Sequence, residues 1–278
     1  MLLALASIIG SFLAFGALSC LFPCNRDQPR FMPKGLADDV LYFFVSLLFY
    51  GAVISGMTRL LVEVGAGERA PAAMKALGAG YGLLPRLPVP VQCLLLLLVT
   101  DIYQYWMHRI FHSSGLWWFH AVHHSSEQVN WSTTYRIHPV NYLAYNAAIA
   151  ILVALMGFSP AAFFVTMVFN LVHAGLVHAN LNWTFGPFRY VLASPVFHRW
   201  HHSNDPVVRN KNFAPTFPVL DVLFGTFHMP MDRLPSGYGA EGVPDSFLAQ
   251  MVYPFRAIAD DMARRGRPVV AAAVDVEG

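Results

Sequence analysis

Histidines are the residues of this sequence best suited to chemistry, and they are crowded into one stretch. All twelve lie between His108 and His228, whereas the first 107 residues contain none. Most of them fall into three short clusters, one of the form H-x-x-x-H and two of the form H-x-x-H-H. The clusters are His108 and His112, then His120, His123 and His124, and finally His198, His201 and His202.

The spacing within each cluster is typical of metal ligands on a helix. Residues three or four positions apart share a helical face, so each cluster can present two or three imidazoles to one point. Neutral imidazole nitrogen binds iron, zinc, copper or nickel. His173 and His178 are two further candidate ligands, although a spacing of five places them off one α-helical face. Ten candidate ligands exceed the needs of one metal ion, and the number favours a binuclear site.

The composition indicates which elements position these histidines. The chain is 56% hydrophobic and only 12% charged, which is unlike a soluble domain and favours a membrane. The fourth of its long apolar stretches is broken at Gly157–Pro160, where a serine can cap one helix and a proline can begin the next. We therefore predict an all-α polytopic membrane helical bundle of four to five spans, including a helical hairpin. The apolar stretches are residues 1–22, 40–62, 89–106 and 142–177.

The distribution of charge predicts the orientation of this bundle. If all five helices cross, fourteen of the eighteen Lys and Arg residues fall on the face that carries the histidines. The positive-inside rule then places the histidine cluster and the C-terminus in the cytoplasm. We expect one domain over residues 1–278, with the histidine motifs at 97–229, a cytosolic helical cap after residue 181 and a disordered tail at 262–278.

Some function classes do not fit the sequence. The net charge is only +2, and no block of Lys and Arg interleaves with aromatic residues, so no nucleic-acid partner is expected. The three cysteines form neither a disulfide framework nor a zinc knuckle. A lone histidine such as His228 is best interpreted as an ordinary hydrogen-bonded residue. The repeated clusters differ, because isolated polar groups beside membrane spans are expensive.

The histidine clusters and their neighbours resemble the fatty acid hydroxylase and sterol desaturase superfamily of membrane-bound di-iron enzymes. The resemblance extends from about Leu97 to Met229. Two positions depart from the common pattern: Asn141 stands where many relatives carry an acidic residue, and Phe213 precedes Ala214 where many have a glycine. The segments that carry the resemblance are 101–112, 116–125, 136–139, 195–202 and 221–226.

This resemblance implies a di-iron enzyme that uses O2 to oxidise a C–H bond of a membrane lipid, and we favour hydroxylation over desaturation. It also implies the metal ligands: the eight clustered histidines, completed by His178 and His173. Asp101 lies two turns before His108 on the same helix face and could orient a ligand from behind. A non-redox zinc protein, either a hydrolase or a structural site, is the alternative, because imidazole alone suits zinc equally.

Electrons for such a reaction must come from outside the chain. The sequence has no flavin or nucleotide fingerprint and no cysteine set for an iron–sulfur cluster. A separate electron donor is therefore expected. The resemblance implies a b-type cytochrome, or a ferredoxin with its reductase.

Overall fold

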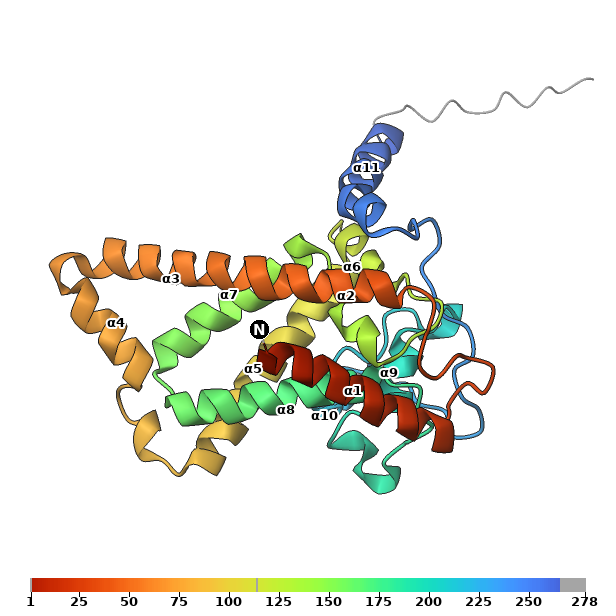
Figure 1. Ribbon diagram of the computed structural model, residues 1–278, viewed down its shortest axis with the longest axis horizontal. Coiled ribbons are helices and arrows are strands. Elements are labelled where there is room, and N and C mark those ends of the chain that lie inside the picture. The colour runs from red at the N-terminus through yellow and green to blue at the C-terminus, as the bar shows by residue number, and fades with distance from the viewer. Residues whose placement is uncertain (1, 114, 266–278) are drawn as a thin grey trace, which may run out of the picture.

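The computed structural model describes residues 2–113 and 115–265, and within these residues the fold is helical with no β-strand (Figure 1). Short 3₁₀ or π turns join several of the helices. The α-helices are α1 (Leu2–Leu21), α2 (Leu36–Val45), α3 (Gly51–Ala66), α4 (Ala70–Ala79), α5 (Val89–Ser113), α6 (Trp117–His124), α7 (Pro139–Met156), α8 (Pro160–His178), α9 (Pro195–His201), α10 (Val219–Leu223) and α11 (Phe247–Arg265). The short turns are η1 (Ser46–Tyr50), η2 (Gly67–Arg69), η3 (Leu84–Arg86), η4 (Trp131–Tyr135), η5 (Gly186–Tyr190) and η6 (Pro206–Val208).

Several helices are built to lie in a membrane, which confirms the predicted fold class. Among the described residues, three helical segments are long and apolar enough to cross a bilayer: Leu36–Arg86, Val89–Ser113 and Pro160–His178. Two shorter apolar helical stretches, Ile9–Leu21 and Pro139–Val153, accompany them. The count of four to five spans stays a prediction. The loop expected between the second and third spans contains a helix of its own, α4.

The turn between α7 and α8 forms as the sequence predicts. Gly157 ends α7 with a left-handed backbone (φ 71°), and the Ser159 side chain accepts a hydrogen bond from Ala162 N at 3.3 Å to cap α8, whose first residue is Pro160. A side chain at Gly157 would also collide with the Tyr81 carbonyl. The two helices diverge from this turn as the arms of a V (Figure 1).

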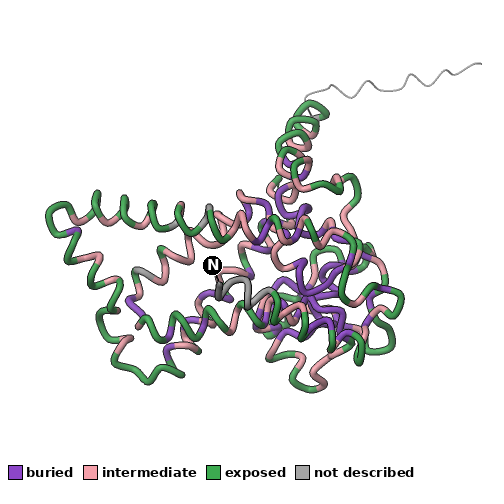
Figure 2. The backbone as a smooth tube through the Cα atoms, in the orientation of Figure 1, coloured by how far each residue is buried: buried purple, intermediate pink, exposed green. Residues whose placement is uncertain are grey.

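Buried residues concentrate at one end of the molecule, where α5, α6, α8 and α9 meet (Figure 2). The helices at the opposite end expose apolar side chains, such as Leu60 and Val64 of α3. This pattern suits a bundle whose surface faces lipid and whose polar interior lies at one end. The apolar core at that end comprises Val177, Ala193, Val196, Phe197, Trp200, Val208 and Met229.

The C-terminal segment is more regular than expected. Residues 262–265 complete α11 and are helical, in contrast to the predicted disordered tail, while residues 266–278 lie outside the described residues. Between α8 and α11 the chain forms short helices and loops, among them α9, which packs on α8. The predicted helical cap over the histidine region is therefore present.

A buried ion pair joins the start of the bundle to the histidine region. Arg136 Nε donates to Asp39 Oδ1 at 2.6 Å, and both side chains are at most 5% exposed. Ser132 Oγ donates to the second carboxylate oxygen, and Arg136 Nη2 donates to the carbonyl of Gly35. The pair fixes α2 against the segment that leads into α7.

Removing one member of this pair should destabilise the protein. We expect Asp39→Ala to cost about 3 kcal/mol, because it leaves the Arg136 charge buried without its partner. Thermal unfolding of the detergent-purified protein would measure the effect as a lowered Tm. Glu127→Ala is the matched control: its carboxylate pairs with Lys34 at the surface, so the Tm should barely change. Equal Tm values for Asp39→Ala and the wild type would contradict this account.

Candidate metal centre

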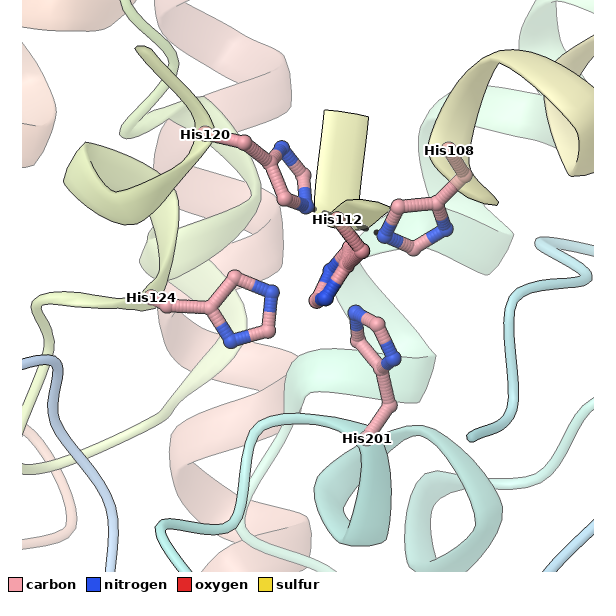
Figure 3. A group of neighbouring side chains, drawn as sticks. All are labelled: His108, His112, His120, His124 and His201. Carbon is pink, nitrogen blue, oxygen red and sulfur yellow. Dashed lines mark hydrogen bonds between the residues drawn. The ribbon is translucent and has the colours of Figure 1, made fainter. Parts of the chain in front are cut away.

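Nine of the ten predicted ligands gather in two adjoining groups. In each group, one ligand atom per residue lies within 4.8 Å of all the others. Figure 3 shows the five rings of the first group pointing into a common space. Centre A consists of His108 and His112 of α5, His120 and His124 of α6, and His201 of α9. Centre B consists of His123 of α6, His178 of α8, and His198 and His202 at α9.

The two centres divide the histidine clusters in a regular way. Histidines four residues apart share a centre, as His120 and His124 do in centre A. Neighbouring histidines separate: His123 belongs to centre B and His124 to centre A. The same division holds for His201 and His202. The His124 and His202 rings, one from each centre, stack with their centroids 4.4 Å apart, so the two centres are adjacent.

Carbonyl groups fix the orientation of the rings in centre A. His108 Nδ1 donates to the Phe213 carbonyl and His201 Nδ1 donates to the Lys211 carbonyl, each at 2.8 Å. A carbonyl oxygen can only accept, so the proton of each neutral ring lies on Nδ1. The Nε2 atom, which carries the lone pair, is then left to face the centre.

Asn141 acts in the same way on a third ring of centre A. Its Oδ1 accepts a hydrogen bond from His120 Nδ1 at 2.8 Å, and the asparagine is 3% exposed. The sequence marked this position only as a departure from the common acidic residue. An amide oxygen fills the role of a carboxylate here without adding a charge.

Centre B is oriented by two further carbonyls. His123 Nδ1 donates to the Arg136 carbonyl at 3.1 Å, and His178 Nδ1 donates to the Ala174 carbonyl at 2.7 Å. Arg136 thus serves the site through its backbone, while its side chain is held by Asp39.

The Nε2 lone pairs repel one another, and a cation between them would remove this repulsion. His108 Nε2 and His120 Nε2 are 3.0 Å apart, and His123 Nε2 and His178 Nε2 are 3.2 Å apart. Because the protons are on Nδ1, each of these contacts brings two lone pairs together instead of forming a hydrogen bond. Further buried Nε2 atoms have no partner among the described residues: those of His112, His124 and His201. The residues present therefore fit metal ions, with imidazole nitrogen as the donor.

Burial keeps the rings uncharged. Removal from water lowers the pKa of the histidines on α6 and α9 well below the ordinary value, and repulsion among neighbouring histidines lowers it further. Neutral imidazole is the form that binds metal. The residues concerned are His120, His123, His124, His198, His201 and His202.

Asp101 serves the site in a less direct way than the sequence predicts. Its carboxylate accepts hydrogen bonds from Thr216 N at 2.7 Å and Phe217 N at 2.9 Å instead of contacting a histidine. Asp221 similarly accepts from Phe213 N and Ala214 N. Both carboxylates therefore hold residues 213–217, and Phe213 in turn provides the carbonyl that orients His108.

Three histidines lie outside the centres: His173, His228 and His138, which caps α7. His173, predicted as a ligand, is not part of either group; its Nε2 lies 3.0 Å from the Ala193 carbonyl, and its ring stacks on Phe169. His228 was interpreted as an ordinary residue, and it too lies outside both groups, packing against Trp200.

A cavity of about 570 Å³ leads to the histidines. Its walls are α5, α7 and α8, so it occupies the V formed by the last two. His108, His120 and His123 line its inner end, while apolar residues such as Val153 and Phe163 line it farther out. No Asp, Glu, Lys or Arg contributes to its wall among the described residues. Its size is ordinary for a small-molecule site.

Comparison with known proteins agrees with this geometry. Residues 93–226 match the fatty acid hydroxylase family model. The chain is 33% identical to the ornithine lipid hydroxylase OlsE of Rhizobium tropici over 65% of this chain and 53% of that protein. It is 33% identical to an alkylglycerol monooxygenase of Danio rerio, over 49% of this chain and 30% of that protein. It is 28% identical to methylsterol monooxygenase 2-2 of Arabidopsis thaliana, over 50% of this chain and 53% of that protein.

The matched region spans about half of these relatives or less. No solved structure matches the chain. The family match nevertheless begins just after α5 starts and ends beyond α10, so it contains every histidine of both centres. Residues 93–226 therefore form a fatty acid hydroxylase domain, in agreement with the resemblance predicted from the sequence.

Proposed function

We propose that this protein is a di-iron monooxygenase that hydroxylates a C–H bond of a membrane lipid. The observation that carries the proposal is the pair of adjoining, buried, all-histidine centres at the inner end of an uncharged cavity. The relatives support a lipid substrate, since their names describe action on ornithine lipids, alkylglycerols and methylsterols.

The nine histidines of the two centres would hold the metal ions, and His173 would not. Two iron ions, when bound, would supply the redox chemistry that activates O2. The protein residues contribute geometry: carbonyl and amide oxygens orient the rings, and burial excludes water. No carboxylate belongs to either group among the described residues, so the ligand set is neutral.

The cavity would place the lipid. An uncharged wall suits a hydrocarbon segment, and the V between α7 and α8 allows a lipid to reach the histidines from within the bilayer. Hydroxylation converts the C–H bond to C–OH with one oxygen atom of O2. The second oxygen atom leaves as water after uptake of two electrons and two protons.

A separate protein would deliver those electrons. The proposed donor is a b-type cytochrome, or a ferredoxin with its reductase. We place the histidine centres and the C-terminus on the cytoplasmic side, as the distribution of Lys and Arg favours.

Metal analysis of the purified protein tests the ligand assignment. We expect His201→Ala to weaken metal binding at centre A and His202→Ala to weaken it at centre B, each by more than about ten-fold, because each removes a ligand. Elemental mass spectrometry after dialysis would report iron and zinc per chain. His228→Ala and His173→Ala should keep the wild-type content, since both rings lie outside the centres. A wild-type metal content in both His201→Ala and His202→Ala would contradict the assignment.

The lipids of expressing cells test the reaction. Cells with the wild-type protein should contain a lipid heavier by one oxygen atom than its precursor, and cells with His201→Ala should not. Ala150→Phe should abolish the product while both metals stay bound, because Ala150 lines the cavity. Ala161→Phe, on the exposed surface of α8, is the matched control and should be active.

A product lacking two hydrogen atoms would indicate desaturation. Bound zinc without electron-dependent O2 uptake would refute the oxygenase proposal.

The amide anchor of His120 can be tested separately. Asn141→Leu should weaken metal binding at centre A by about 10- to 100-fold, because His120 Nδ1 loses its acceptor and the ring its orientation. Asn141→Asp restores an acceptor oxygen and should bind metal well. Asn182→Leu, at an exposed position, should have no effect on metal affinity measured by competition with a chelator. An unchanged affinity in Asn141→Leu would show that this hydrogen bond is dispensable.

A further inference from the structure

The last described helix, α11, has an exposed apolar stripe that the proposed reaction does not use. Its members recur at alternating intervals of four and three residues, so they follow one face of the helix. Leu248 is 75% exposed and Met262 is 68% exposed, which is unusual for apolar side chains on a polar helix. The apolar stripe consists of Leu248, Val252, Phe255, Ala259 and Met262.

Most contacts of α11 with the protein come from a different face, although Phe255 of the stripe also packs against Phe119. Tyr42 of α2 donates a hydrogen bond to Gln250 Oε1 at 3.0 Å, and its ring packs edge-on against Phe247. His138 Nε2 donates to the Met251 carbonyl at 3.2 Å. With about 100° of rotation per residue, this packed face lies roughly a quarter turn from the centre of the apolar stripe.

These contacts set the depth of α11 relative to the bilayer. His138 is the N-cap of α7, an apolar helix that leads away from the histidine centres. Tyr42 belongs to α2, in the first of the segments long enough to cross a membrane. The docked half of α11 therefore lies level with the ends of helices in the membrane. Figure 1 shows α11 running across the direction of α3 and α8.

Charged residues lie away from the stripe. Arg256 lies just beside the stripe. Asp260 and Arg264 are turned toward the opposite side of the helix, as the helical rotation requires. An apolar face, a polar face and a position at the ends of membrane helices are the features of an interfacial helix. Arginine at the boundary can reach lipid phosphates.

We propose that α11 lies on the bilayer surface on the histidine side and inserts its apolar stripe among the lipids. The occupant of this face is the same membrane that surrounds the spanning helices. The attachment would also steady α6, because Phe255 packs against Phe119 with ring centroids 5.4 Å apart, next to His120 of centre A. The proposal does not depend on the reaction that the protein catalyses.

A fluorescent reporter in nanodiscs tests the insertion. Single cysteines would be placed at Met262 or Leu248 on the stripe and at Arg264 on the opposite side, after Cys20, Cys24 and Cys93 are replaced by alanine. Each would be labelled with NBD in protein that retains its metals. Val64→Cys on α3 provides a lipid-facing reference, because Val64 is 79% exposed on an apolar helix. Asp245→Cys provides a water-exposed reference, because its side chain is 86% exposed.

The expected result is a contrast between the two faces of one helix. NBD at 262 and 248 should emit at shorter wavelength and be quenched at least about three-fold more by spin-labelled phosphatidylcholine than NBD at 264, because only the stripe contacts lipid. NBD at 264 should resemble the reference at 245. Emission at 262 and 248 that matches the water-exposed reference would overturn the proposal, as would equal quenching on both faces.

Discussion

The structure depends on how imidazole lone pairs are aimed. Each oriented ring donates its Nδ1 proton to an oxygen outside the centre, and the consequence is that the Nε2 lone pairs meet inside it. Lone pairs that face one another at 3.0 Å, buried away from water, are unfavourable unless a cation lies between them. Metal ions bound here would therefore be linked to folding at this end of the molecule, because without them the protein must hold these atoms together against their repulsion.

Buried carboxylates support this arrangement without belonging to either centre. Asp101 and Asp221 each accept hydrogen bonds from two backbone N–H groups, and Asp39 is paired with Arg136. A carboxylate near a metal ion would be drawn into coordination unless its own partners were better placed. Because these partners are complete, the acidic groups fix the backbone that orients the rings, such as Phe213. The centres thereby keep a neutral ligand set, which would leave bound metal ions their full positive charge.

The sequence predicted which histidines form the site, but not how they divide between the two centres. Clustering and helical spacing identified eight of the nine histidines that gather in two groups, and the same 3.6-residue geometry explains why His123 and His124 separate, since adjacent side chains point about 100° apart. His178 was predicted together with His173 outside this spacing, and of the two only His178 joins a group. The orienting carbonyls of Lys211 and Phe213 could not be predicted, because every residue has a carbonyl and only the tertiary fold selects one. Asp101 was predicted to orient a ligand, but its oxygens accept from backbone N–H groups of residues 216 and 217, which are remote in sequence and could not be foreseen.

The membrane helices show a similar limit. Gly157, Ser159 and Pro160 carry local signals that predict the turn between α7 and α8. The divergence of the two helices carries no such signal, because helices that are apolar on all sides do not indicate which face packs against protein and which faces lipid or a cavity. That divergence creates the uncharged cavity whose inner end reaches the histidines. With no charged group among the described residues of its wall, the cavity would distinguish the lipids of the proposed reaction by the length and shape of the hydrocarbon that fits the V. In the proposed reaction, the depth to which α7 and α8 admit the substrate would then select the carbon that is presented to the two centres.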